Sequence, residues 1–317
     1  MPLISQNSLI PDTVRYCVLC IGKFDGVHRG HQALAAQAVS LAAKLSTQAI
    51  AVTFDPPPVQ ILNPSQPIRQ PITPMDRRIK LLKEFGFADV AVFETGHWLL
   101  DLSARAFFDQ IILQKFSAVG LVEGPNFQFG KNRGGGVHEL TDWCQEHGIF
   151  FVEAAPVEQS GGWVTSSRVA GEISSGNIKA ATDLLGHGFE TIGMVVRGAG
   201  RGRTINVPTA NLDSCDTLLP KPGVYAAMAS VADDSGAFGQ LYPAAVNIGS
   251  QPTFSSDIQR LEAHLIGLTD ADLYGRQVKL QWVDRIRETI KFTNVEELIR
   301  QIAIDIETCR RICTDFN

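Results

Sequence analysis

Apolar residues in the first half of the chain form short continuous runs, separated by longer stretches with a helical period. Five short runs predict buried strands, at Val18–Gly22, Ala49–Phe54, Asp89–Phe93, Ala118–Val122 and Ile149–Ala154. The stretches between them carry apolar residues three or four positions apart, which predicts helices over Gln32–Leu45, Asp76–Phe85, Ser103–Phe116 and Val137–His147. Strands that alternate with helices of this length favour right-handed βαβ units and a parallel sheet.

The second half of the chain has a different pattern. Six short apolar or alternating runs, separated by Gly, Pro, Asp and Ser, predict strands at Thr191–Arg197, Thr204–Leu212, Gly223–Val231, Pro243–Ile248, Arg260–Leu268 and Gln277–Ile286. Short strands at this spacing favour an antiparallel barrel. A last helix follows, with Asn294 as its N-cap and Glu297 three residues later.

The change of pattern places a domain boundary near Gly186–Gly188. The expected domains are therefore residues 1–186 and 187–317, and the helical stretch Asn177–Leu185 belongs to the first of them. A chain of 317 residues is long enough for two such domains, at ~150 residues each.

Composition excludes several classes of protein. Twenty-eight Lys and Arg against 33 Asp and Glu give a net charge of −5, so we expect no nucleic-acid partner. The N-terminus lacks the pattern of a signal peptide, and no run of about 18 apolar residues is present, so we expect a cytoplasmic protein without membrane contact. The pairs Cys17/Cys20 and Cys309/Cys313 lie in apolar surroundings, which favours core packing over a metal or redox site.

A first cluster of reactive residues follows the first predicted strand. It runs from Gly22 to His31 and opens the first predicted helix, where the free N–H groups of a helix N-terminus suit a phosphate. Glycines at positions 22, 26 and 30 allow close approach of the backbone, and His28 and His31 project the same way. The alternative is a capped turn with two surface histidines, but the whole segment in this position predicts a nucleotide site.

A second cluster follows residue 187. A Gly- and Arg-rich stretch, which includes Gly193, Gly198 and Arg201, leads to Pro208-Thr209-Ala210-Asn211. Thr209 and Asn211 point to the same side of an extended chain and offer oxygen ligands that suit Mg²⁺. From these residues alone, a flexible basic hairpin followed by an ordinary strand remains an alternative. Glu262 is a carboxylate in an otherwise apolar strand, and its pattern alone favours a solvent-facing residue.

These two clusters carry a resemblance to a known family. The segment G-x-F-D-G-x-H-x-G-H at residues 22–31 resembles the nucleotidyltransferase signature of the bifunctional prokaryotic riboflavin kinase/FAD synthetase family. Matching stretches follow in order, including Thr53-Phe54-Asp55-Pro56, residues 124–130, Pro208-Thr209-Ala210-Asn211 and Leu273-Tyr274-Gly275. The resemblance implies a Rossmann-like α/β nucleotidyltransferase (FMN adenylyltransferase-like) domain, followed by an all-β Greek-key or split barrel with a C-terminal helix.

The resemblance also implies activities and partners. The chain is expected to phosphorylate riboflavin with ATP to give FMN, and to join FMN to AMP from ATP to give FAD and pyrophosphate. Its expected partners are riboflavin, FMN, FAD and ATP, with Mg²⁺ or another divalent cation as cofactor. The sequence leaves the oligomeric state open.

Site residues carry over by position. In the first domain, His28 and His31 contact ATP phosphates, and the other expected nucleotide-binding positions are Gly22, Phe24, Asp25, Gly26, Gly30, Asn126, Ser166, Ser167 and Arg168. In the second domain, Glu262 is the expected general base for the ribityl 5′-hydroxyl. Thr209 and Asn211 hold the metal and ATP, and the remaining expected ATP-binding positions are Gly193, Gly198, Arg201 and Pro208. Arg287 and Phe292 are expected to contact the flavin.

Three positions depart from the family pattern. Ala170 stands where the family has an Arg, Pro57 stands where it often has a His, and Asn206 replaces a Gly. Asn tolerates the left-handed conformation that a Gly can require, so we expect the kinase site to survive. The first two departures motivate an alternative function, a riboflavin kinase whose first domain is a weak or inactive nucleotide-binding scaffold.

Overall fold

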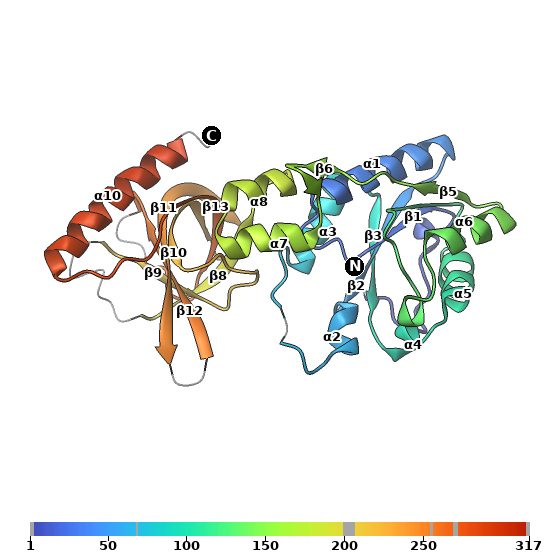
Figure 1. The fold of residues 1–317 in the computed structure, drawn as a ribbon, viewed down its shortest axis with the longest axis horizontal. Coiled ribbons are helices and arrows are strands. Elements are labelled where there is room, and N and C mark those ends of the chain that lie inside the picture. Colours follow the sequence, from blue (N-terminus) through green and yellow to red (C-terminus); the bar gives the residue numbers. More distant parts are fainter. Residues whose placement is uncertain (1–2, 68, 199–206, 254–255, 269–271, 315–317) are drawn as a thin grey trace. The chain divides into compact units, whose positions relative to one another are not determined.

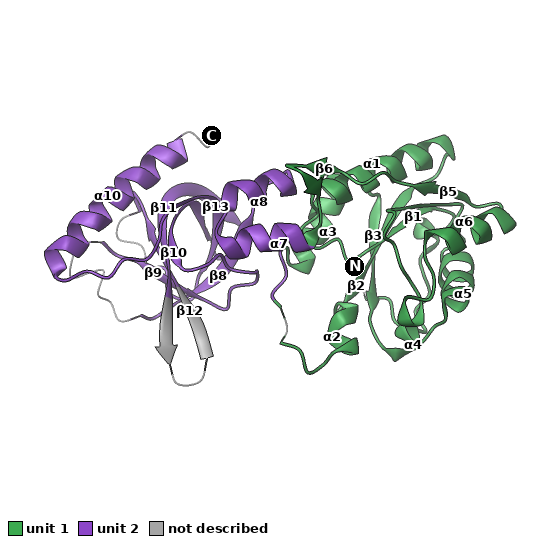
Figure 2. Cartoon of the chain, in the orientation of Figure 1, with its two compact units in different colours: residues 1–69, 73–166 green, residues 70–72, 167–317 purple. Residues whose placement is uncertain are grey.

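The computed structural model describes residues 3–67, 69–198, 207–253, 256–268 and 272–314. The chain folds into two compact units, shown in different colours in Figure 2. Unit 1 contains Met1–Arg69 and Thr73–Ser166, and unit 2 contains Gln70–Ile72 and Ser167–Asn317.

Unit 1 is built on a parallel sheet, as the sequence predicts (Figure 1). The strand order is β3-β2-β1-β4-β5, with bounds β1 Val18–Ile21, β2 Ala49–Asp55, β3 Asp89–Glu94, β4 Gly120–Glu123 and β5 Phe150–Glu153. Val18 pairs with Ala49 of β2 on one side and with Gly120 of β4 on the other. A two-stranded ribbon of β6 (Glu158–Gln159) and β7 (Gly162–Trp163) follows.

Alternate residues of the strands feed two hydrophobic layers. Val18 and Cys20 pack with Ala and Leu residues of α1 (Arg29–Lys44) and α3 (Met75–Glu84). Leu19 and Ile21 face the opposite layer, which is formed by the segment Ala104–Lys115 and by α6 (Val137–Glu146). The sheet is therefore covered on both faces, which explains why its strands read as continuous apolar runs.

One predicted helix of unit 1 differs from expectation. The stretch Ser103–Phe116 is an α-helix only over α5 (Ala104–Phe107) and continues as a π-helix over Phe108–Lys115. Ser103 begins it by accepting a hydrogen bond from the Ala106 N–H at 3.1 Å. Two short helices, α2 (Pro58–Leu62) and α4 (His97–Leu100), complete the described helices of this unit beside short 3₁₀ turns.

Unit 2 is a closed antiparallel barrel with a strand at each of the six predicted places, although the strand predicted from Thr204 begins at Ala210 and residues 204–206 lie outside the described residues. The barrel order is β10-β11-β12-β9-β8-β13, with bounds β8 Glu190–Val196, β9 Ala210–Asp213, β10 Gly223–Ala232, β11 Phe238–Thr253, β12 Ser256–Leu265 and β13 Gln277–Arg287. The C-terminal helix α10 (Val295–Thr314) packs on β10 and β11. Asn294 caps it as predicted, because its Oδ1 accepts a hydrogen bond from the Glu297 N–H at 2.8 Å.

The two compact units divide after Ser166, and the domain boundary expected near Gly186 stays a prediction. Helices α7 (Ser166–Ser175) and α8 (Ile178–Leu185) therefore group with the barrel, apart from Ser166 itself. The reason is direct contact: Lys179 Nζ lies 2.7 Å from a carboxylate oxygen of Asp284 on β13. Gly176 packs so closely on Tyr225 that an added Cβ would lie 2.7 Å from the phenol oxygen.

Within the described residues, no helix has both the length and the apolar character that crossing a bilayer requires.

Candidate active sites

The segment from Gly22 to His28 lies at the switch point of the unit 1 sheet. The chain runs from β1 outward through β2 to β3, then returns to the other side of β1 to form β4 and β5. Loops that follow β1 and β4 therefore diverge and leave a crevice at the carboxyl ends of the strands, where open α/β sheets bind ligands. His28 occupies the N-cap position of α1, so the free N–H groups of this helix point to the same place.

The backbone of this loop is strained. Gly26 has φ +89°, and two residues with side chains, Phe24 and Val27, have φ +49° and +38°. A β-branched residue such as Val27 rarely adopts this conformation, which persists only where the surroundings enforce it. Gly30 has little space as well, because an added Cβ would lie 3.1 Å from both the His28 ring and the carbonyl oxygen of Val164.

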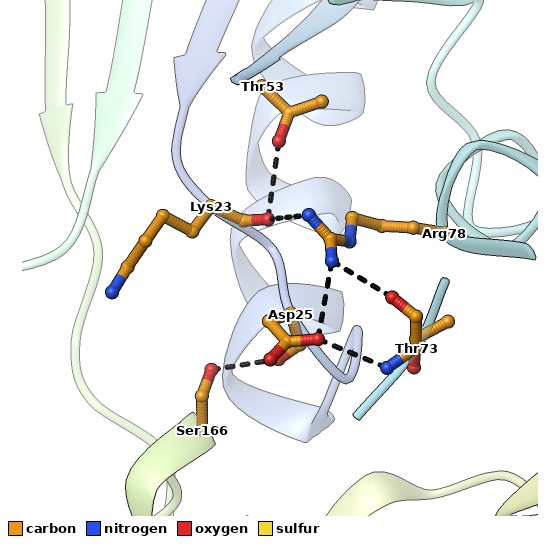
Figure 3. A network of polar contacts seen from close by, with 6 residues as sticks. All are labelled: Lys23, Asp25, Thr53, Thr73, Arg78 and Ser166. Carbon is orange, nitrogen blue, oxygen red and sulfur yellow. Dashed lines mark hydrogen bonds and ion pairs between the residues drawn. The ribbon is translucent and has the colours of Figure 1, made fainter. Parts of the chain in front are cut away.

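Arg78 of α3 holds the loop in this shape, as Figure 3 shows. Its guanidinium donates hydrogen bonds to the carbonyl oxygens of Lys23 and Thr73, both at 2.9 Å, and lies 3.3 Å from the carboxylate of Asp25. Arg78 is only 4% exposed. Burial lowers its pKa, and Asp25 and Asp55 oppose that shift. A buried cation with this many acceptors is a rigid anchor for the backbone that it binds.

Three further hydrogen bonds fix the same loop (Figure 3). The Asp25 carboxylate accepts one from the Thr73 N–H at 3.1 Å, and its carbonyl oxygen accepts one from the Ser166 hydroxyl at 2.8 Å. Thr53 donates to the Lys23 carbonyl oxygen at 3.2 Å. Asp25 and Ser166, both expected to bind nucleotide, therefore contact the loop itself. Ser167 and Arg168 are the next residues of α7 and belong to unit 2.

The two histidines of the loop form a stacked pair. Their ring centroids are 3.7 Å apart, with an angle of 17° between the planes. The Phe24 ring packs against His31 in a T-shaped arrangement, with 5.2 Å between the two ring centroids. Burial lowers the pKa of His31 well below its ordinary value, and the positive charges of Arg78 and Lys23 add to the shift. Nδ1 of His31 is buried and has no hydrogen-bond partner among the described residues. Such a ring can offer a hydrogen bond to a phosphate oxygen.

The end of β4 contributes a buried carboxyl group to the same crevice. Glu123 is 2% exposed and its Oε1 accepts a hydrogen bond from the Ile21 N–H at 2.7 Å. Burial raises its pKa well above the ordinary value, although the hydrogen bond acts in the opposite direction. Asn126, expected near the reacting phosphates, lies exposed in the turn that follows β4.

Sequence reasoning missed Arg78 and Glu123. Arg78 lies on the polar side of a predicted helix, and nothing in its pattern separates it from the neighbouring Arg77. Glu123 did carry a signal, because it ends an apolar strand directly before Gly-Pro-Asn. A charged residue in that place points to a site at the carboxyl end of the strand.

The expected kinase residues of unit 2 meet on the outer surface of the barrel. Glu262 on β12 pairs directly with Asn211 on β9 and, on its other side, with Asn247 on β11. The intervening residues Ala263 and Ala210 are buried, so the alternation turns Glu262 and Asn211 away from the core. Thr209 directly precedes β9, two residues before Asn211 and next to the buried Ala210, so continued alternation puts it on the side of Asn211.

The Gly-rich stretch is only partly brought to this site. Gly198 lies against the Asn211 side chain, so a side chain at position 198 would have to displace that amide. Gly193 does not join the site, because it is buried in β8 and its Cα faces Leu212 and Cys215. Arg201 lies outside the described residues.

The two expected flavin contacts lie near the start of α10. Arg287 donates hydrogen bonds from Nε and Nη2 to the two carboxylate oxygens of Asp305, at 2.9 and 2.6 Å. The guanidinium carbon lies 6.0 Å from the Phe292 ring centre. Asp305 is 4% exposed, so this pair attaches α10 to the barrel. Contact of Arg287 and Phe292 with a flavin stays a prediction.

The donors of unit 2 suit a hard divalent cation. The described residues contain no cluster of three or more His, Cys, Asp and Glu that could hold a metal ion by itself. A hydroxyl, an amide oxygen and a carboxylate on neighbouring strands instead match the way in which Mg²⁺ is bound, through few protein oxygens together with substrate phosphates.

Comparison with known proteins matches both halves of the chain to known families. Residues 10–168 match the FAD synthetase family and residues 185–313 match the riboflavin kinase family. The bifunctional riboflavin kinase/FMN adenylyltransferase of Escherichia coli (strain K12) is 32% identical over 93% of this chain and 92% of its own length. That of Bacillus subtilis (strain 168) is 30% identical over 94% and 93%. The chain belongs to the bifunctional riboflavin kinase/FMN adenylyltransferase family.

A solved structure supports the fold of the whole chain. A protein from Streptococcus pneumoniae, described as a macrolide-efflux protein, has a TM-score of 0.84 and 30% identity, and the match covers 93% of this chain and 94% of that one. The predicted family, fold class and enzyme class are therefore confirmed, with the FAD synthetase module in the first half of the chain and the riboflavin kinase module in the second. ATP is the shared co-substrate of the two modules.

A first prediction concerns the anchor of the FAD synthetase loop. Arg78→Lys keeps the positive charge but cannot bind two carbonyl oxygens and a carboxylate in one plane. We expect FAD formation from supplied FMN to fall about ten- to hundredfold, because weaker charge-assisted hydrogen bonds to the loop, worth ~1.5–3 kcal/mol, leave its donors less well positioned. Riboflavin phosphorylation in the same protein should be unchanged.

Arg77→Lys is the matched control for this experiment. Arg77 is the preceding residue of α3 and its guanidinium lies 3.7 Å from Glu84. Parental FAD formation in Arg78→Lys, or an equal loss in both variants, would show that Arg78 does not anchor the loop.

A second prediction concerns the pH dependence of stability. The pKa of Glu123 is raised in the folded protein, so the folded state keeps a proton that the unfolded chain loses above its ordinary pKa. Stability from this group is therefore present at acid pH and is lost as pH rises toward the folded pKa. Glu123→Gln keeps the acceptor for Ile21 and carries no charge. Denaturant unfolding should show the variant more stable than the parent at pH 8, with the difference shrinking toward pH 5; a difference that grows toward pH 5 contradicts this.

Proposed function

We propose that the two units perform successive reactions on a flavin. The barrel transfers the γ-phosphoryl group of ATP to the ribityl 5′-hydroxyl of riboflavin, which gives FMN and ADP. The parallel-sheet unit then joins FMN to the AMP part of a second ATP, which gives FAD and pyrophosphate. The observation that carries this proposal is that each unit holds its own group of expected site residues and has its own packed core.

In the kinase reaction, Glu262 acts as the general base. The ribityl hydroxyl attacks the γ-phosphorus, the bond to the β-phosphate oxygen breaks, and Glu262 takes the hydroxyl proton. Thr209 and Asn211 hold Mg²⁺, which neutralises phosphate charge, together with the ATP phosphates. The pairing of Glu262 with Asn211 on neighbouring strands supports this assignment, because it places base and phosphate ligand side by side.

In the adenylyl transfer, an FMN phosphate oxygen attacks the α-phosphorus of ATP, and the bond to the β-phosphate oxygen breaks. Charge builds on the phosphate oxygens as pyrophosphate leaves. His28, His31 and the free N–H groups at the start of α1 donate hydrogen bonds to these oxygens. The stacked geometry of the histidines and the rigid loop beneath them support this role, because preorganised donors need no rearrangement during the reaction.

A kinase with an inactive first unit is the weaker alternative. Ala170, which stands where the family has an Arg, is one reason for this alternative. The residue is 3% exposed within α7, so its side chain is part of the packed interior. The histidine pair, its supporting Phe24 and the Arg78 anchor are all in place. Incubation of the protein with riboflavin, ATP and Mg²⁺, followed by chromatographic separation of FMN and FAD, distinguishes the two: accumulation of FMN without FAD supports the alternative.

A third prediction tests the kinase base. Glu262→Gln keeps the shape of the side chain and cannot take a proton. FMN formation should fall by about 10²–10⁴, the range typical of general-base catalysis, and FAD formation from supplied FMN should stay at the parental rate. Undiminished riboflavin phosphorylation would remove Glu262 from the mechanism.

A fourth prediction is the reciprocal experiment. Replacement of His28 and His31 together by Ala removes both side-chain donors from the loop, so FAD formation should be abolished. Riboflavin phosphorylation should remain near the parental rate, because the barrel has its own site. If a folded double variant also lost FMN formation, the assignment of one activity to each unit would be wrong.

A further inference from the structure

His264 contacts the segment that carries the proposed metal ligands of the barrel. It lies on β12, two residues after Glu262, and therefore projects from the same outer face of the strand. Its Nδ1 lies 2.8 Å from the carbonyl oxygen of Pro208, the residue directly before Thr209. A carbonyl oxygen only accepts hydrogen bonds, so Nδ1 must carry the proton and donate.

The position of this bond matters because of where the strand ladder ends. Pairing between β12 and β9 runs from Leu261–Leu212 through Glu262–Asn211 to Ala263–Ala210 and goes no further. Thr209 therefore precedes the first paired residue. Among the described residues, the hydrogen bond between His264 and Pro208 holds this segment to β12 just beyond the last strand pair.

The bond constrains Thr209 through the peptide plane. The carbonyl group of Pro208 and the N–H of Thr209 belong to one planar unit that ends at the Thr209 Cα. Fixing the direction of that carbonyl therefore fixes the orientation of the plane and restricts the direction in which the Thr209 side chain leaves the chain. The ring of Pro208 also fixes φ of that residue, which removes one rotation on the N-terminal side of the plane.

We propose that His264 is a positioning residue for the kinase reaction, which holds the Pro208–Thr209 peptide so that the Thr209 hydroxyl and the Asn211 amide act together on Mg²⁺ and the ATP phosphates. The inference rests on the proposed ligand role of Thr209 and Asn211. It assigns to His264 no contact with substrate and no proton transfer.

The experiment compares His264→Ala, which removes the donor, with His264→Asn, whose amide nitrogen restores a donor at a similar distance from the backbone. His187→Ala is the matched control, because His187 also lies in unit 2 and its Nδ1 also contacts a carbonyl oxygen, that of Gly188 at 3.0 Å. The readouts are the Mg²⁺ concentration for half-maximal riboflavin phosphorylation and, without turnover, calorimetric titration with ADP in the presence and absence of Mg²⁺.

We expect His264→Ala to raise the half-maximal Mg²⁺ concentration about three- to tenfold, as loss of one ordinary hydrogen bond predicts. The gain in ADP affinity that Mg²⁺ provides should shrink by a similar factor. His264→Asn should recover most of both values, and His187→Ala should match the parent. FAD formation from supplied FMN should be unchanged in all three variants.

Parental Mg²⁺ dependence in His264→Ala overturns the proposal, as does a His264→Asn variant that behaves like His264→Ala. Thr209→Val separates this failure from failure of the ligand assignment. If Thr209→Val loses its Mg²⁺ response while His264→Ala keeps it, only the positioning role is wrong. If Thr209→Val keeps the parental response, the proposed ligand set is wrong and the role of His264 falls with it.

Discussion

Strand pairing decides where the reactive side chains of both units lie. In the parallel sheet, the reversal of strand order between β1 and β4 opens the crevice at which the histidine loop begins. In the barrel, the antiparallel register of β9, β12 and β11 puts Glu262 between two asparagines. In the barrel, a shift of this register by one residue would turn Glu262 from the outer face into the core. The backbone hydrogen bonds between strands therefore decide where the site side chains lie, and contacts between side chains only refine that arrangement.

The histidine loop needs more than pairing, because its backbone is strained. Phe24 and Val27 both have positive φ, a conformation that costs about 1–3 kcal/mol per residue. The buried guanidinium of Arg78 offsets this cost. It donates hydrogen bonds to the carbonyl oxygen of Lys23 in the loop and to that of Thr73, in the segment that contacts Asp25. Arg78 lies on α3, and Thr73 lies in the segment just before this helix. The histidine loop of unit 1 is thus stabilised by a helix that contributes no expected contact with the substrate.

The sequence predicted the strands and helices better than it predicted the side-chain contacts that hold the loops in place. Apolar periodicity located all five strands of the sheet and all six of the barrel, because buried strands leave a signal in their own residues. It did not find the π-helix over Phe108–Lys115, whose apolar pattern resembles that of an α-helix. Nor did it find Arg78, since a buried arginine on a helix looks like its exposed neighbour until the carbonyl groups that it binds are in place. The change of apolar pattern near Gly186 marks where the strand-rich half begins, whereas the compact units follow packing, and α8 packs on β13.

The proposed contact of His31 with ATP phosphates would link nucleotide binding to protonation. Burial, the stacked His28 and the neighbouring cations Arg78 and Lys23 lower the pKa of His31 and favour its neutral form. The negative charge of a polyphosphate acts in the opposite direction, because it favours the imidazolium. Uptake of a proton on binding would add the ionisation heat of the buffer to the heat of binding. Calorimetric enthalpies for the first unit would then differ between buffers of low and high ionisation enthalpy at one pH, while the affinity stays the same.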